Sequence, residues 1–352
     1  MSEEEQAIGW EAIDKEMERL YGEQEPKHYG TMIPYSLGGP DPLEGISAYV
    51  KEEPLPHWHL VTYGFSDLFE KENEESEYSG YGFELTFRLL KHENEQEPPA
   101  WSLNFLQNLG RYIFTSGNYF QAGHYLNTNG PIALDSDTLL QSIAFIEDPE
   151  LPPISSPNGR VEFLQVVGIT VDEREAMEMW NTLGLLKAAS SHLPLYITDL
   201  SRQSFMNDPL MKEAFQLGMQ RDGSSTGSLF LDNLAWNEKK SLFKKTTIMI
   251  TIGAKDAPLI AQIVNGRIPN NKDLQLFGQN LSILFSPAEQ PKVEIKANQA
   301  ILYLNQECVN ELLEVLVPKV GEYTLNSFKG IVFNIVKSEI KDSDGNVVET
   351  IG

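Results

Sequence analysis

The stretch at residues 83–89 constrains the fold of this 352-residue chain more than any other. Its residues, FELTFRL, alternate between apolar and polar, so four large apolar side chains share one face of an extended segment. A face of that size must be buried against other elements. The sequence therefore predicts a central core strand here. Residues 58–63 predict a second strand, because they are rich in aromatic and β-branched residues.

Helices and strands are both predicted along the rest of the chain. Apolar stripes at helical spacing, with caps or prolines at the ends, predict helices at residues 9–21, 101–115, 172–180, 183–189, 209–220 and 306–316. Short apolar or alternating runs predict strands at residues 143–147, 161–170, 195–200, 281–285, 292–296 and 300–304. The order shows no regular strand–helix–strand alternation, which favours an α+β fold over a doubly wound sheet.

A domain boundary is predicted at residues 222–227, DGSSTG, which are small and polar. We expect an N-terminal α+β domain at 1–222, a linker or edge segment at 223–240 and a smaller C-terminal α+β domain at 241–352. Each domain is expected to contain a mixed or antiparallel sheet packed with helices, with a cleft between the two domains.

Charge is concentrated in the first part of the chain. The formal net charge is -24, of which residues 1–222 carry -23 and residues 223–352 carry -1 (-23 - 1 = -24). Such acidity repels nucleic acid and anionic lipid and attracts a basic partner, although it can also serve solubility alone. No apolar run approaches the roughly 18 residues of a membrane helix, and the acidic N-terminus is unlike a secretory signal. We therefore expect a cytoplasmic protein.

Candidate catalytic chemistry is sparse. His57 and His59 point the same way on a strand, as two metal ligands could, and Asp67 and Glu84 could complete a cluster. No third ligand has a diagnostic spacing, so packing and hydrogen bonding are the favoured roles. Ser66 lacks the second glycine of a nucleophile elbow. With a single cysteine there is no internal disulfide. The sequence predicts neither an enzyme nor a cofactor.

Several long segments resemble the suppressor-of-fused family. They include LGGPDPL at residues 37–43, HWHLVTYGFSDLFE at 57–70 and SGYGFELTFRL at 79–89. The resemblance continues in the same order through residues 111–118, 148–149, 161–168 and 197–222. A series of long segments in one order is more specific than any single short motif.

The resemblance implies a non-catalytic protein with two domains that binds a polypeptide. In animal members the domains close on a short extended peptide of a Gli-type transcription factor, which is held between them as an added strand. Bacterial members are associated with toxin systems as immunity proteins. We therefore expect a protein or peptide partner, plausibly a toxin. The alternatives are a metal-dependent hydrolase using the His57, His59, Asp67 and Glu84 cluster, or an intracellular signalling scaffold.

By position, the resemblance implies a partner-peptide site at Tyr112, Phe120, His124, Asp148, Ser228, Leu229 and Phe230. For Tyr112 and Phe120 the structural alternative is ordinary core packing, and for Asp148 it is a turn. His124 stands where animal members have an aspartate that faces the partner, so a charge-assisted contact is not expected there. After DGSSTG the chain goes almost directly into the C-terminal domain. This feature and the departure at His124 favour a compact bacterial member with a partner other than a Gli-type factor.

Overall fold

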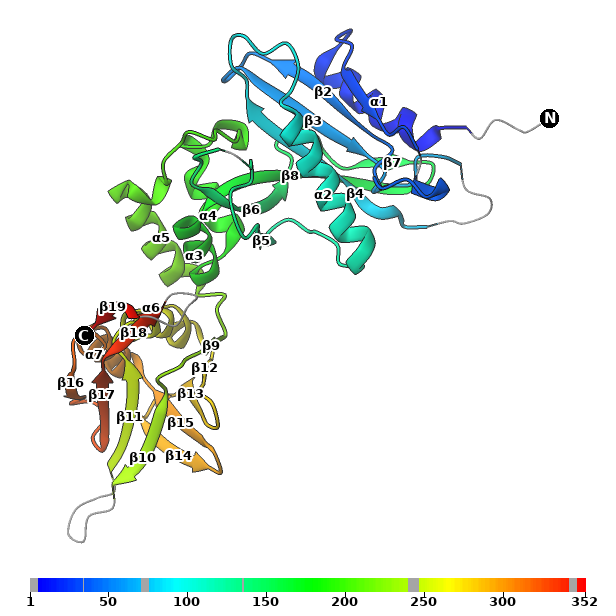
Figure 1. The fold of residues 1–352 in the computed structure, drawn as a ribbon. Helices are drawn as coiled ribbons and strands as arrows, with labels where there is room; N and C mark the ends of the chain where they lie inside the picture. The colour runs from blue at the N-terminus through cyan, green and yellow to red at the C-terminus, as the bar shows by residue number, and fades with distance from the viewer. Residues whose placement is uncertain (1–5, 34, 71–75, 135, 240–246, 342–346) are drawn as a thin grey trace. The chain divides into compact units, whose positions relative to one another are not determined.

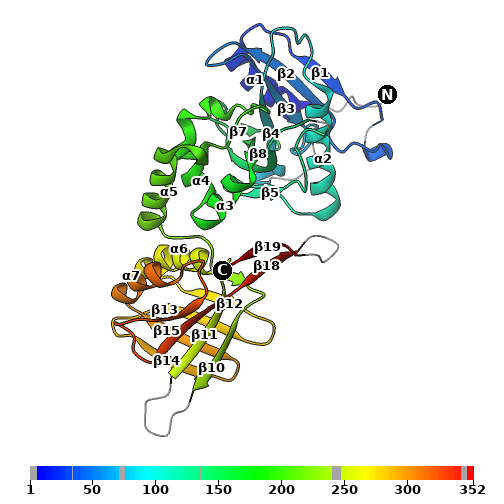
Figure 2. The ribbon, with the colours of Figure 1, turned by 60° about the vertical axis from the view of Figure 1, so that its left-hand side comes forward.

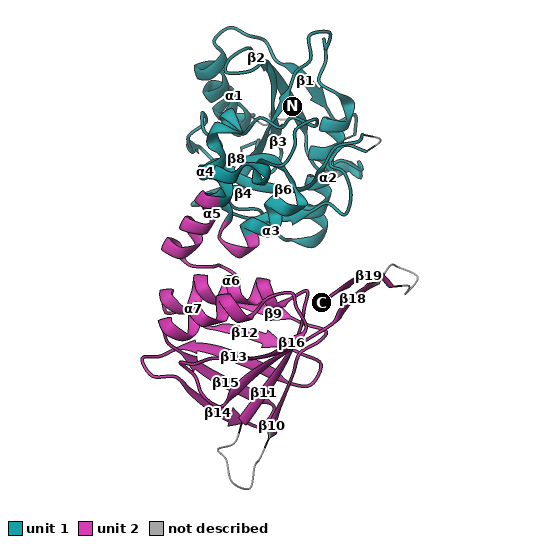
Figure 3. Ribbon diagram, turned by 90° about the vertical axis from the view of Figure 1, so that its left-hand side faces the viewer, with its two compact units in different colours: residues 1–177, 182–212 teal, residues 178–181, 213–352 magenta. Residues whose placement is uncertain are grey.

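The chain divides into two compact units. The computed structural model describes residues 6–352 except 34, 71–75, 135, 240–246 and 342–346. Unit 1 comprises Met1–Met177 and Thr182–Lys212, and unit 2 comprises Glu178–Asn181 and Glu213–Gly352 (Figure 3). Both units combine helices with sheets, so the predicted α+β class is confirmed. No helix in the described part of the chain combines the length and apolar character needed to cross a bilayer.

Unit 1 is built on one mixed sheet. Its described strands run in the order β1 (Lys27–Gly30), β2 (Gly45–Lys51), β3 (His57–Tyr63), β4 (Tyr78–Leu90), β8 (Gly159–Thr170), β6 (Leu140–Glu147) and β5 (Tyr125–Asn127), with β7 (Ile154–Ser156) also paired to β8. The β4–β8 pair is parallel and the other pairs are antiparallel. The helices are α1 (Ile8–Tyr21), α2 (Ala100–Ser116), α3 (Val171–Met179), α4 (Thr182–Ala188) and the start of α5 (Pro209–Asp222) (Figure 1).

Helices α1 and α2 pack on opposite faces of this sheet. On β4, Phe83, Leu85, Phe87 and Leu89 join a core with Leu106, Leu109 and Ile113 of α2. Ile13 and Met17 of α1 pack instead on Val61, Tyr63 and Phe163. Because side chains alternate along a strand, the polar residues of β4 face α1 and are buried as well.

A predicted strand at residues 195–200 is absent. Pro194–Tyr196 forms a short 3₁₀ turn, and Leu195 has a φ of 49°, which is incompatible with a strand. Thr198 forms an isolated parallel bridge with Leu89. Alternating apolar residues alone did not distinguish this turn from a strand.

Unit 2 contains two further sheets. The described strands of one follow the order β10 (Ala235–Lys239), β11 (Thr247–Gly253), β17 (Ile331–Val336) and β16 (Gly321–Thr324). Those of the other follow the order β14 (Lys292–Lys296), β15 (Gln299–Leu304), β13 (Ser282–Pro287), β12 (Leu274–Phe277) and β9 (Ser228–Phe230). Helices α6 (Ala257–Arg267) and α7 (Gln306–Val315) contribute to their common core. A hairpin of β18 (Ser338–Lys341) and β19 (Val347–Ile351) extends beyond both sheets (Figure 2).

The boundary between the units falls inside α5 rather than after residue 222. Trp180 explains this position, because its indole Nε1 donates to Asp222 Oδ2 at 3.1 Å. Its ring also packs so closely on Gly218 that a Cβ there would lie 2.2 Å from the ring. The C-terminal part of α5 therefore belongs with unit 2. Residues 223–240, predicted as a linker or edge segment, supply β9 and β10, which are both edge strands.

A buried ion pair joins the strands on the α1 side of the sheet. Arg88 on β4 donates two hydrogen bonds to Asp148, at 2.6 and 3.0 Å, and both side chains are fully buried. Burial alone raises the pKa of Asp148, but contacts with His59 and Arg88 outweigh it and hold this pKa well below its usual range. Burial and the charge of Arg88 lower the pKa of His59 to about 4. His59 Nε2 lies 3.2 Å from Asp148 Oδ2, but its direction does not meet hydrogen-bond geometry.

Glu84 is a second buried carboxyl on β4. It accepts hydrogen bonds from the backbone amides of Gly64 and Ser66 at 3.0 and 2.9 Å, and from the hydroxyls of Thr62 and Ser66 at 2.7 Å. Glu84 thereby fixes the turn after β3. Burial raises the pKa of Glu84 to about 7, and the hydrogen bonds oppose part of that rise.

Replacing Arg88 with methionine (Arg88→Met) should lower the free energy of unfolding by about 3–5 kcal/mol, because Asp148 is left buried without its counter-charge. Arg160→Met is the matched control. The exposed pair of Arg160 with Glu162 on β8 should contribute about 1 kcal/mol or less. Urea unfolding of both variants measures the difference, and equal losses would contradict the role given to Arg88.

Replacing Glu84 with glutamine (Glu84→Gln) should change how stability depends on pH. Between pH 4.5 and 7 an unfolded chain has released the Glu84 proton while the folded chain retains it, so the free energy of unfolding falls as pH rises. From pH 5.5 to 7.5 this loss amounts to about 2 kcal/mol. The advantage of wild type over Glu84→Gln should shrink accordingly in urea titrations. The exposed variant Glu23→Gln is the control. A difference between wild type and Glu84→Gln that stays constant with pH would contradict the assignment.

Candidate functional site

The four residues of the possible metal cluster do not converge. His57, His59, Asp67 and Glu84 each have other surroundings: Glu84 fixes the β3 turn, and Asp67 Oδ2 accepts the amide of Gly80 at 2.7 Å. Across the described ranges, no three His, Cys, Asp or Glu side chains are arranged to hold a metal ion. The hydrolase alternative therefore has no assembled site in this part of the chain.

Tyr112 and Phe120 meet in an aromatic stack. Phe120 is buried between Tyr112, at a ring-centroid distance of 5.8 Å, and Phe145, at 4.1 Å. Tyr112 is 39% exposed, so it presents the outer face of this stack to solvent. Phe120 is therefore part of the packed interior, and Tyr112 is the surface residue of the stack.

Phe120 also lines a hollow of about 500 Å³ in unit 1. The other lining residues are Tyr78, Gly80, Tyr81, Gly82, Phe83, Tyr119, Gln121, Glu162 and Leu164. Three of these side chains, Tyr78, Tyr81 and Tyr119, are well exposed tyrosines. Tyrosine combines a large apolar ring with a polar end, which suits contact with a polypeptide.

His124 and Asp148 occupy different environments. His124 is exposed, and its carbonyl accepts the amide of Phe145 at 2.9 Å, which holds it next to the aromatic stack. Asp148 is buried with Arg88 and accepts the amides of Glu150 and Leu151 at 2.9 and 3.1 Å. Its side chain therefore shapes the turn after β6, whereas that of His124 is open to contact.

Strand β9 lies at the end of the five-stranded sheet of unit 2. It pairs in parallel with β12, and within the described residues no strand pairs with its other edge. Phe230 is 82% exposed and stacks on Phe277 at 5.0 Å. A large aromatic pair beside an open edge is the kind of surface that edge strands in isolated proteins avoid.

The backbone direction along β9 can be deduced from its hydrogen bonds. Gly227 O accepts the amide of Gln275, and the amide of Leu231 donates to Phe277 O, so alternate residues face β12. Leu229 lies between them and also faces β12. The amides and carbonyls of Ser228 and Phe230 consequently point toward the open edge.

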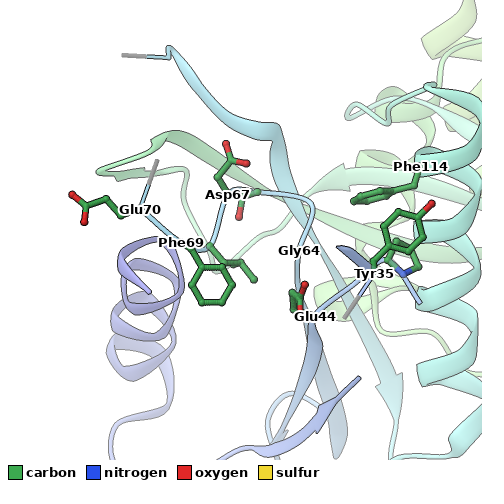
Figure 4. A pocket seen from close by; sticks show the side chains of 10 residues that line it. Tyr35, Glu44, Gly64, Asp67, Phe69, Glu70 and Phe114 are labelled. Atoms are coloured by element: carbon green, nitrogen blue, oxygen red, sulfur yellow. The ribbon is translucent and has the colours of Figure 1, made fainter. Parts of the chain in front are cut away.

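A second hollow in unit 1, of about 360 Å³, lies between the turn after β3 and the end of α2. We name it the Tyr35 groove, and its lining residues are Tyr35, Pro42, Glu44, Gly64, Ser66, Asp67, Leu68, Phe69, Glu70 and Phe114. Figure 4 shows Phe69 on one side and Tyr35 with Phe114 on the other. Tyr35 meets Phe114 edge-to-face at 5.5 Å.

Sequence reasoning missed the Tyr35 groove. Residues 37–43 indicated only the family resemblance, and no role was assigned to the apolar residues next to them. Met32, Ile33 and Leu37 are 99%, 54% and 76% exposed. Apolar side chains so close to a glycine- and proline-rich turn cannot easily reach a core. This pattern was the signal in the sequence that could have indicated an exposed apolar surface here.

Comparison with known proteins identifies the family of the N-terminal part. Residues 39–203 match the family model of suppressor of fused protein (SUFU). Over 248 residues the chain is 35% identical to Suppressor of fused homolog of Homo sapiens and, equally, of Mus musculus. These alignments cover 65% of this chain and 51% of each relative, so the chain spans about half the length of the curated relatives it matches.

Solved structures extend the similarity to the fold. The crystal structure of Drosophila Suppressor of Fused matches with a TM-score of 0.68 and 23% identity, covering 94% of this chain and 97% of that one. A chain of the Sufu-Fu complex crystal structure matches with a TM-score of 0.55 and 33% identity, covering 59% of this chain and 97% of that one. Residues 39–203 therefore belong to the suppressor-of-fused family, and the fold of the chain is similar to that of Drosophila Suppressor of Fused.

Proposed function

We propose that this chain is a non-catalytic binding protein that takes up an extended segment of a partner polypeptide as an added strand along β9. The open edge of β9 is the observation that carries this proposal, because Ser228 and Phe230 direct outward backbone groups that pair with no strand among the described residues. In strand addition such groups supply hydrogen bonds, and nearby pockets select side chains. Phe230 and Phe277 offer an apolar surface beside that edge.

Unit 1 is proposed to offer the partner a second contact surface of its own. Tyr112 and Phe120 would grip a partner side chain, and exposed His124 would contribute a polar contact from the neighbouring turn. Asp148 takes part indirectly, by holding the turn after β6, because its own oxygens are occupied by Arg88 and by backbone amides.

The similarity to a chain of a protein complex supports the proposal of a protein partner. One matching structure is that of the Sufu-Fu complex, in which a suppressor-of-fused chain is crystallised with another protein. The excess of acidic residues in the first 222 positions favours a partner with a basic surface. We further propose that this partner is a bacterial toxin for which the chain is the immunity protein, and that binding occurs in the cytoplasm.

Strand addition can be tested with Ser228→Pro. Proline removes the outward amide of Ser228, while an edge position tolerates its ring. Peptides selected from a displayed random library against the wild-type protein should bind this variant about tenfold more weakly in fluorescence anisotropy, since one backbone hydrogen bond and its alignment are lost. The surface of unit 1 is tested separately, because peptides that bind at the Tyr112–Phe120 stack should be weakened by a similar factor in Tyr112→Ala.

Val348→Ala is the control for these variants, because Val348 is exposed on the separate hairpin β18–β19. It should leave peptide affinity unchanged. Thermal unfolding of each variant separates lost binding from lost folding. Selected peptides that bind Ser228→Pro and Tyr112→Ala as tightly as the wild type would refute the proposed site.

The toxin hypothesis needs its own experiment. A protein captured from the native host with the wild-type chain, and not with Ser228→Pro, should arrest bacterial growth when expressed alone. Co-expression of this chain should restore growth, and Ser228→Pro should not. A captured protein that leaves growth unaffected would instead support a signalling role.

A further inference from the structure

The Tyr35 groove has the chemistry of a site for a cationic side chain, and the proposed function leaves it unused. Its walls are aromatic, with Phe69 facing Tyr35 and Phe114 across the hollow (Figure 4). Phe69 and Tyr35 are 41% and 43% exposed, so their rings are open to a ligand. A cation close to an aromatic face is attracted by the ring quadrupole.

Carboxylates provide the charge of the Tyr35 groove. Glu44 lies at its base, between the aromatic walls, and Asp67 and Glu70 lie along its rim (Figure 4). None of the described lining residues is basic, and no ion pair joins Glu44 to another residue that the structure describes. The main chain at Glu44 is fixed, since its carbonyl accepts the amide of Thr31 at 3.1 Å. The backbone that carries this carboxylate is thus held in place before any ligand arrives.

Exposed apolar side chains are concentrated in the sequence around Tyr35. Met32, Ile33 and Leu37 flank Tyr35 in the sequence and are exposed. A lone cation would leave this surface uncovered, whereas a peptide with apolar residues on both sides of the cation would cover it. Among cationic side chains, the planar guanidinium of arginine stacks on aromatic rings and pairs with a carboxylate at the same time.

We propose that the Tyr35 groove docks a partner polypeptide through an arginine flanked by apolar residues. The guanidinium lies between Phe69 and the Tyr35–Phe114 pair, with its charge paired to Glu44. The flanking apolar side chains cover Met32 and Leu37. This surface belongs to unit 1 alone and does not require the β9 edge.

The test uses two fluorescein-labelled peptides, Gly-Leu-Arg-Leu-Gly and the same peptide with citrulline in place of arginine. Citrulline keeps the shape of the side chain and removes its charge. The wild-type protein should bind the arginine peptide about fivefold more tightly in fluorescence anisotropy at low salt. Glu44→Gln should bind both peptides equally, whereas Glu23→Gln, an exposed carboxylate beyond the far end of α1, should retain the preference.

Phe69→Ala provides a second variant should Glu44→Gln fail to fold, and it should weaken the arginine peptide by a similar factor. Equal affinity of the wild type for both peptides would overturn the proposal, as would unchanged binding by folded Glu44→Gln and Phe69→Ala. A wild-type dimer in sedimentation that Phe69→Ala disperses would assign the groove to a second copy instead. Ser228→Pro should keep the arginine preference, so this result is independent of the β9 proposal.

Discussion

The bidentate contact between Arg88 and Asp148 is the interaction on which the architecture of unit 1 depends. It connects the central strand β4 to the turn after β6 on the face of the sheet that α1 covers. Gln165 of β8 accepts another hydrogen bond from Arg88, so one guanidinium spans neighbouring strands. Removing one partner of such a pair leaves a charge in a place that water cannot reach. The sheet is thereby held in one register beneath the helices that cover it.

Helix α2 uses this rigid support to display aromatic residues. Its buried side packs on β4, and its C-terminal turns carry Tyr112 and Phe114. Tyr112 covers Phe120, whereas Phe114 contacts both Tyr35 and Tyr81. One helix therefore supplies Phe114 to the wall of the Tyr35 groove and Tyr112 to the stack on Phe120. Binding residues that stand on a packed helix lose less freedom when a partner binds than residues on a loop.

The periodicity of apolar residues predicted where strands and helices lie better than it predicted which residues surround their side chains. The alternation at residues 83–89 identified β4 as a central strand, but Glu84 and Arg88 lie in a second core that only tertiary contacts reveal. Helix α6 was not predicted, although its buried residues Ala257, Ile260, Ala261 and Val264 follow a helical spacing. Likewise, the stack of Tyr112 on Phe120 was located from the family resemblance, whereas the Tyr35 groove joins residues distant in sequence that no local pattern connects.

The shortness of β9 limits what its backbone can achieve. Its outward amides and carbonyls, on Ser228 and Phe230, allow about four hydrogen bonds, each contributing roughly 1 kcal/mol net. That total corresponds to a dissociation constant of about 1 mM, before the entropy of ordering a flexible segment is subtracted. Main-chain pairing can therefore set only the direction and alignment of an incoming strand. Discrimination between ligands must come from aromatic anchors such as Phe230, and exchanging those anchors would retarget the protein without rebuilding its fold.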